Sequence, residues 1–157
     1  MSVPVSARGF EICGLGEIAI RCRDLDRMEH FYAEVIGLPH LARRAGGIVF
    51  FRTGGGHAGH TAVLALFDGS ASVRPGLHPG GTPRGGGEST LHHFALAVTP
   101  EGQEAAIRWF DRLGQPYRIE EFDWIGWRGL FTQDPEGNTV ELVAAPHEAR
   151  SKAEALA

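Results

Sequence analysis

The sequence is poor in two features that would assign it quickly to a class of proteins. It contains only two cysteines, Cys13 and Cys22, in 157 residues. This is too few for a disulfide framework or a cysteine-rich zinc cluster, so we interpret both as reduced thiols. It also has no excess of basic charge, because 15 Lys and Arg stand against 19 Asp and Glu, for a formal net charge of −4. A nucleic-acid partner is therefore not expected.

Long apolar runs are missing as well. No segment of the chain approaches the roughly 18 apolar residues that a membrane span requires. Residues 1–10 also lack the apolar core of a secretory signal peptide. We therefore expect a cytoplasmic protein with no membrane partner. Its length fits about one domain, and its 43% hydrophobic and 22% charged residues are typical of a globular chain.

Glycine, in contrast, is abundant, with 22 residues of this type. The excess lies in two clusters, at 54–56 and 76–87. Three prolines are interspersed in the region of the second cluster, a composition typical of a linker rather than of a packed element. We therefore predict a linker over residues 70–88 that separates two modules.

The chain repeats itself at an offset of 76 residues. Segments 15–22 and 91–98 both alternate apolar and polar residues, as half-buried strands do. A helix with apolar residues at i, i+3, i+4 and i+7 follows each strand, and further strands follow each helix, including one near 39–44 and one near 117–122. Each half of the chain therefore reads as one βαβββ module.

The face of the predicted strands that points away from the helices carries titratable side chains. Equivalent positions in the two repeats pair Glu17 with His93 and Ala65 with Glu141. A pseudo-twofold arrangement of the modules would bring Glu17, His93 and Glu141 toward one point. Burying two carboxylates and an imidazole together is costly unless a cation neutralises them. These residues therefore predict a divalent metal site.

The predicted fold is α+β, with two tandem βαβββ modules forming a curved mixed sheet around a metal-binding cleft. We expect one domain over residues 12–147, made of a first module at 12–69 and a second module at 89–146. The helices are expected to pack on the apolar face of the sheet, which leaves the opposite face to line the cleft.

Two motifs carry a resemblance to a known family. One runs from Arg23 through Met28 to Phe31-Tyr32, and the other is 134–142, with the sequence DPEGNTVEL. On these motifs, residues 15 to 145 resemble the vicinal oxygen chelate superfamily. That superfamily includes lactoylglutathione lyases, extradiol dioxygenases and the bleomycin- and fosfomycin-resistance proteins.

The resemblance implies metal ligands on the first and last strand of each module. The corresponding positions here are Glu17, Ala65, His93 and Glu141. Alanine cannot bind a metal, so one ligand is missing from the first module. The neighbouring glycine cluster offers His57 or His60 as a replacement, although strict alternation places His60 on the face opposite Ala65.

The ligand types limit the candidate cofactor to one divalent metal ion. One imidazole with two carboxylates suits Zn, Ni, Mn, Co or Mg, whereas Fe requires a second histidine such as His60. The resemblance implies a glyoxalase-like lyase or isomerase, in which the metal chelates vicinal oxygens of a small substrate and Glu17 or Glu141 shuttles a proton. Two alternatives stay open: a metal-free small-molecule binding protein like the bleomycin-resistance members, and an iron-dependent extradiol dioxygenase.

Several further residues are candidates for contact with the substrate. A cation beside Glu17 can pair either with a substrate carboxylate or with Glu17 itself, and aromatic side chains near one strand can form a wall of the cleft or pack in the core. A homodimer is also expected, because many members of the resembled family build the cleft from modules of two chains. The predicted substrate-binding residues are Arg21, Thr61, Trp124, Trp127 and Arg128.

Overall fold

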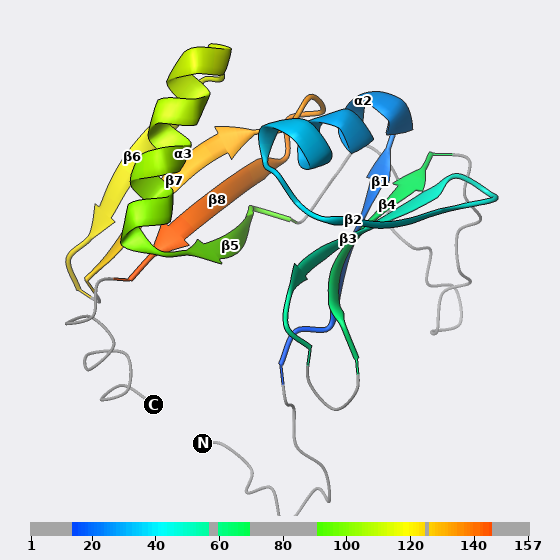
Figure 1. Ribbon diagram of the computed structural model, residues 1–157, viewed down its shortest axis with the longest axis horizontal. Helices are drawn as coiled ribbons and strands as arrows, with labels where there is room; N and C mark the ends of the chain where they lie inside the picture. Colours follow the sequence, from blue (N-terminus) through cyan, green and yellow to red (C-terminus); the bar gives the residue numbers. More distant parts are fainter. Residues whose placement is uncertain (1–13, 57–59, 70–90, 125, 146–157) are drawn as a thin grey trace, which may run out of the picture.

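The computed structural model describes residues 14–56, 60–69, 91–124 and 126–145 (Figure 1). The predicted linker at 70–88 and His57 lie outside these residues. The first module consists of β1 (Glu17–Cys22), α2 (Leu25–His30), the π-helix η1 (Phe31–Val35), β2 (His40–Arg44), β3 (Ile48–Gly54) and β4 (Ala62–Asp68). The second module consists of β5 (Phe94–Val98), α3 (Pro100–Leu113), β6 (Tyr117–Phe122), β7 (Trp127–Gln133) and β8 (Thr139–Ala144). The α+β class and the repeated βαβββ order are confirmed.

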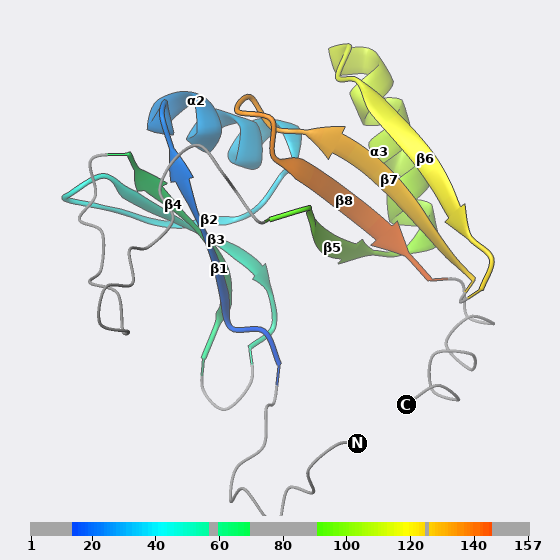
Figure 2. The ribbon, with the colours of Figure 1, turned by 180° about the vertical axis from the view of Figure 1, so that it is seen from behind.

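Each module forms its own four-stranded sheet. The strand orders are β1-β4-β3-β2 and β5-β8-β7-β6. In both sheets the first and last strands of the module pair in parallel, and the remaining pairs are antiparallel. Figures 1 and 2 show the two sheets side by side, so the predicted curved sheet consists of two mixed sheets.

The helices begin and end where side-chain chemistry satisfies their backbone. Asp24 precedes α2 and accepts a hydrogen bond from the Arg27 amide at 3.0 Å, and Thr99 accepts one from the Gly102 amide at 3.0 Å at the start of α3. Gly114 ends α3 with φ of 65°, a conformation that costs glycine little. None of the described helices is long and apolar enough to cross a membrane.

The first helix widens into a π-helical turn after His30. The Ile36 amide donates to the Phe31 carbonyl at 3.0 Å, which is an i to i+5 bond. The wider turn allows the adjacent Phe31 and Tyr32 both to be buried, with their rings edge-to-face at 5.2 Å. The sequence pattern predicted a regular helix here. The structure has a π-helical turn instead, and its buried side chains join a core that also contains Phe94 of the second module.

A turn between β7 and β8 joins the second module to the first. The buried Asp134 carboxylate accepts hydrogen bonds from the Tyr32 hydroxyl at 2.8 Å, from the Glu136 amide at 2.9 Å, and from the Asn138 amide and side chain at 2.9 and 2.8 Å. Burial, with the nearby Asp134 charge, holds the pKa of Tyr32 well above its ordinary value, so the hydroxyl stays protonated and donates. The two sequence motifs are therefore one structural unit.

Two further contacts strengthen this junction. The Glu136 carboxylate accepts hydrogen bonds from the backbone amides of Arg23 and Asp24, at 2.7 and 2.8 Å, just before α2 begins. On the other side of the first helix, the Trp109 indole of α3 donates to the Val35 carbonyl at 3.1 Å. Both ends of the α2–η1 segment are thus held by the second module.

Candidate metal and substrate site

A histidine and a carboxylate meet on the second sheet. Glu141 lies on β8, between Ala95 of β5 and Phe131 of β7, and His93 immediately precedes β5. The His93 Nε2 atom lies 3.2 Å from Glu141 Oε2, and the Glu141 side chain is 7% exposed. Leu142, the next residue of β8, packs toward α3, so Glu141 points to the opposite face, which is turned toward the viewer in Figure 2.

Burial makes the charged form of Glu141 costly. Desolvation raises the pKa of this carboxyl above its ordinary value, the nearby His93 opposes that rise, and the Glu120 charge adds to it. A carboxylate in this setting is stabilised by any cation that approaches it. The environment of Glu141 therefore fits a residue that binds a positive ion.

Space beside Glu141 depends on a glycine. Gly129 lies on β7, and a Cβ atom at this position would be 2.6 Å from Glu141 Oε1. Because Gly129 has no side chain, nothing at this position blocks Glu141 Oε1. With His93 Nε2 beside the other oxygen, the pair offers one nitrogen and one carboxylate, a ligand set that suits Zn and similar divalent ions.

Two contacts with neighbouring rings, one between ring nitrogens and one edge-to-face, orient the His93 ring. Its Nδ1 atom lies 2.7 Å from Nδ1 of His92, and its ring meets Phe131 edge-to-face at 5.7 Å. The contact with His92 is not expected from strand alternation, because residues 91–93 precede β5 rather than continue it. Such outer contacts hold an imidazole in one orientation, which is how metal-binding histidines are positioned.

Within one chain, the predicted ligand positions of the first module do not add a metal ligand to the His93–Glu141 pair. Glu17 lies exposed on β1, in the other sheet, and Ala65 occupies the buried β4 position equivalent to Glu141. Among the described residues, no three or more His, Cys, Asp or Glu side chains gather into a group that could hold a metal ion. The structure thus brings His93 and Glu141 together and leaves Glu17 apart from them.

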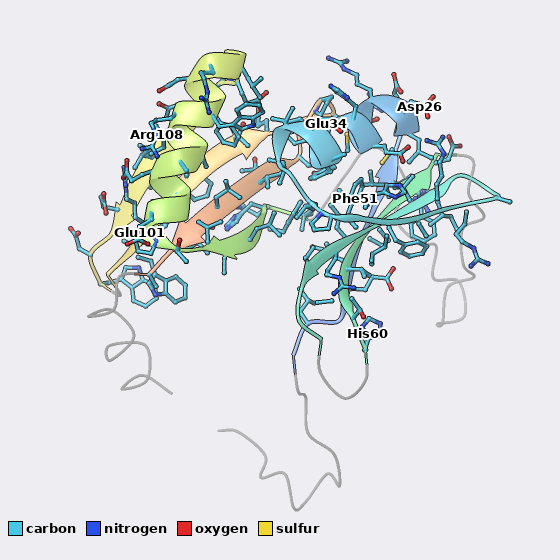
Figure 3. All side chains as sticks on the ribbon, in the orientation of Figure 1. Asp26, Glu34, Phe51, His60, Glu101 and Arg108 are labelled. Carbon is cyan, nitrogen blue, oxygen red and sulfur yellow. The ribbon has the colours of Figure 1, made fainter. Side chains whose placement is uncertain are left out.

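Within one chain the structure places His60 beside Gly16. Its ring lies against Gly16, where a Cβ atom would be 3.2 Å from His60 Nδ1. Gly16 and Glu17 are neighbours with opposite side-chain directions, so His60 lies on the side of β1 away from Glu17. Figure 3 shows His60 at the end of the first sheet that is remote from Asp26 on α2.

Arg128 lies on the face of the second sheet that is opposite to Glu141. Its guanidinium forms an ion pair with Glu104 on α3, and its Nε lies 3.4 Å from Glu121 Oε1. Both partners lie on the α3 side of the second sheet. The geometry therefore does not support contact between Arg128 and a ligand beside Glu141.

The other predicted substrate residues divide between the two modules. Trp127 alternates with Arg128 on β7 and so shares a face with Glu141, whereas Trp124 lies in the preceding turn and is 71% exposed. Arg21 is exposed on the same face of β1 as Glu17, with no ion pair between them in the described part of the chain. Thr61 is exposed just before β4.

Sequence reasoning missed an arginine on the Glu141 face. Arg118 of β6 pairs in register with Phe131, which in turn pairs with Glu141. The Arg118 guanidinium carbon lies 5.1 Å from the centre of the Phe131 ring, and Nη1 lies 3.2 Å from Glu120 Oε1. Alternation along β6 could have placed Arg118 and Glu120 on one face, but only the strand register shows which residues they face.

The fold and the histidine–carboxylate pair define a class: duplicated βαβββ proteins with candidate metal ligands on the sheet face away from the helices. The chain belongs to the Glyoxalase/Bleomycin resistance protein/Dioxygenase superfamily, which it matches over residues 14–142. A comparison with curated proteins found no significant match.

Solved structures of the same superfamily share the fold. A lactoylglutathione lyase from Agrobacterium tumefaciens is 27% identical, with a TM-score of 0.64 over 85% of this chain and 94% of that one. The fosfomycin resistance protein FosX from Listeria monocytogenes is 19% identical, with a TM-score of 0.61 over 90% and 99%. A glyoxalase/dioxygenase from Nostoc punctiforme is 19% identical, with a TM-score of 0.61 over 94% and 97%.

Proposed function

We propose that this protein is a metal-dependent lyase or isomerase of the glyoxalase type, acting on a small substrate with two adjacent oxygens. The observation that carries the proposal is the 3.2 Å contact between His93 and the buried Glu141. The similarity to a lactoylglutathione lyase supports the same class of reaction. When bound, the divalent ion supplies Lewis-acid polarisation of the substrate oxygens.

The residues of this site have distinct roles in the proposal. His93 contributes Nε2 and Glu141 contributes its carboxylate to a Zn, Ni, Mn, Co, Mg or Fe ion. In the proposal the Glu141 carboxylate also accepts a proton from a carbon next to a carbonyl of the substrate and returns it. Glu17 is the third ligand and the second candidate for proton transfer.

We further propose that Glu17 reaches the site from a second copy of the chain. In one chain Glu17 and the His93–Glu141 pair lie in separate sheets. β1 and β5 are edge strands of those sheets. Each module therefore has an edge strand, next to its candidate ligand positions, that a second chain can approach. A twofold homodimer would place the first module of each chain against the second module of the other and form two equivalent sites.

Metal retention tests the first proposal. Protein dialysed against Zn or Ni and then against buffer should keep close to one ion per chain by elemental analysis. Glu141→Ala should lose the ion. Glu120→Ala is the matched control, because Glu120 lies on the same face but is 40% exposed and pairs with Arg118. Wild-type protein that keeps no ion, or equal retention in both variants, would contradict the proposal.

Mixing two inactive variants tests the shared site. Glu17→Ala and Glu141→Ala chains are unfolded and refolded together, so that half of the dimers are mixed. In a shared arrangement each mixed dimer regains one intact site, or about a quarter of all sites. Sites contained within one chain regain none, and that result would contradict the shared arrangement alone.

Ala65 favours a second candidate function, a metal-free protein that binds a small molecule. This position is fully buried and offers no ligand atom. The discriminating result is that ligand binding survives Glu141→Ala in a metal-free binding protein and is lost in the metal-dependent enzyme.

An iron-dependent dioxygenase, which needs a second histidine, is disfavoured by the position of His60. Oxygen uptake with catechols under ferrous iron tests this function.

A further inference from the structure

A hollow lies at the end of the second sheet, and its lining includes Phe131, the β7 residue that pairs with Glu141. It has a volume of 340 Å³, within the roughly 300–1,000 Å³ range of small-molecule sites, and it is formed where β6, β7 and the start of β8 meet the segment after α3. Of the described residues that line it, Arg118 alone is charged. The lining residues are Gln115, Pro116, Tyr117, Arg118, Phe131, Thr132, Gln133 and Thr139.

The strand register connects two lining residues of this hollow, Arg118 and Phe131, to Glu141. Arg118, Phe131 and Glu141 form one row across β6, β7 and β8. Adjacent strands are about 4.8 Å apart, so the Arg118 and Glu141 backbones are separated by roughly 10 Å. The Arg118 side chain leans over the Phe131 ring, toward Glu141, which shortens the span between the two functional groups.

Arg118 retains the capacity to bind an anion. Within the described part of the chain its one ion pair is with Glu120, two residues along the same strand, and the two side chains are 65% and 40% exposed. Exposed pairs of this kind contribute little. A guanidinium has five N–H donors in a planar fork, and one such pair leaves most of them available. Contact with the Phe131 face holds the fork in place at a small entropic cost.

We propose that Arg118 binds an anionic group of the substrate, so that the substrate is a vicinal-oxygen compound with a carboxylate or similar anion several bonds away. This inference rests on the proposed function, because His93 and Glu141 anchor the oxygen end. Arg118 thereby takes the role of pairing with a substrate carboxylate, which the sequence suggested for Arg21. Arg128, the other arginine predicted to bind substrate, is held by Glu104 and Glu121 on the opposite face.

Chelating probes of matched length test the proposal on Zn-loaded protein. The monohydroxamates of succinic, glutaric and adipic acid carry a carboxylate at increasing distance, and their methyl esters lack the charge. For at least one length, the free acid should bind about tenfold or more tightly than its ester, the gain typical of a charge-assisted hydrogen bond. Equal binding of acid and ester at all three lengths would overturn the inference.

Arginine variants test whether Arg118 causes the tighter binding of acids than of esters. Arg118→Gln should reduce the acid-to-ester ratio to about one, and Arg118→Lys should restore part of it, because the charge returns without the planar fork. Arg128→Gln should leave the ratio unchanged. A ratio that survives in Arg118→Gln, or falls equally in Arg128→Gln, contradicts the inference. Arg118 is exposed on an edge strand, so its variants are expected to fold, which circular dichroism checks.

A metal-free experiment separates this inference from the proposed function. Failure of the metal site shows as weak binding of acids and esters alike. The role of Arg118 is then measured by titrating metal-free protein with glutarate and following the Arg side-chain Nε–Hε signals by NMR. A saturable shift of the Arg118 signal, absent for Arg128, is expected. Equal and unsaturable shifts of both signals would overturn the inference.

Discussion

The two modules share a backbone plan but differ on the face away from the helices. In the first sheet Ala19 of β1 lies opposite Ala65 of β4, and in the second sheet Ala95 of β5 lies opposite Glu141 of β8. The same register therefore carries a buried methyl group in one module and a buried carboxylate in the other. A repeated fold does not imply repeated chemistry, because function depends on the side chains of the site.

The connections before the last strand differ as well. In the second module, the turn at Asp134 holds the helix of the first module through Tyr32. In the first module, the glycine-rich segment at this position contains no residue equivalent to Asp134. The second module thus supplies two of the candidate ligands, His93 and Glu141, together with the Asp134 carboxylate that holds the modules together. The following predictions test this unequal division.

The largest expected effect is on the junction. Asp134→Ala removes the acceptor of four hydrogen bonds and leaves the buried Tyr32 hydroxyl without its partner. We expect a loss of about 3 kcal/mol or more in the free energy of unfolding, measured by urea denaturation. Tyr32→Phe removes only one donor and should cost about 1 kcal/mol. Equal losses in the two variants would show that Asp134 does not organise the junction.

Giving the first module the missing carboxylate sharpens the comparison. Ala65→Glu buries a charge and should destabilise metal-free protein by about 2–4 kcal/mol. Saturating Zn should recover most of this loss and bind at least about tenfold more tightly than to wild type, because a fourth ligand is present. Ala65→Gln, of similar size but neutral, should lose stability without gaining affinity. Thermal unfolding with and without Zn measures both effects.

Replacing the Glu141 carboxylate of the second module should stabilise metal-free protein, whereas Ala65→Glu should destabilise it. The folded-state pKa of Glu141 is raised above its unfolded value, so folded protein binds this proton more tightly. Stability therefore falls as the pH rises through these two pKa values. Glu141→Gln removes that dependence and should raise Tm at neutral pH by about 2 °C. Melting curves between pH 4 and 7 check this, and an unchanged pH slope would contradict it.

The smallest expected effect concerns the second contact between the modules. Trp109→Phe removes the indole donor to the Val35 carbonyl while keeping an aromatic ring. Because Trp109 is 39% exposed, water replaces part of the lost interaction, and a cost of about 0.5–1 kcal/mol is expected by denaturation. Trp124→Phe, at a side chain that is 71% exposed, is the control and should change nothing measurable.

Local sequence patterns were reliable where one property decided the outcome. Alternation placed Glu17 and Arg21 on one face of β1 and Glu141 on the outer face of β8, because side chains of a strand alternate strictly. Alternation does not apply to His92, which precedes β5 and contacts His93, and it could not place Arg128. The contacts of Arg128 with Glu104 and Glu121 show which face of β7 meets α3.

The sequence by itself determined the duplicated βαβββ order, the apolar face of each sheet and the identity of the candidate ligands, because these depend on periodicity and residue type. Only the tertiary structure decided which of those ligands meet. His93 and Glu141 come together through the parallel pairing of β5 and β8, and Arg118 joins their face through the pairing of β6 with β7. Strand register and the separation of the two sheets are properties of long-range packing, which no local pattern in the chain encodes.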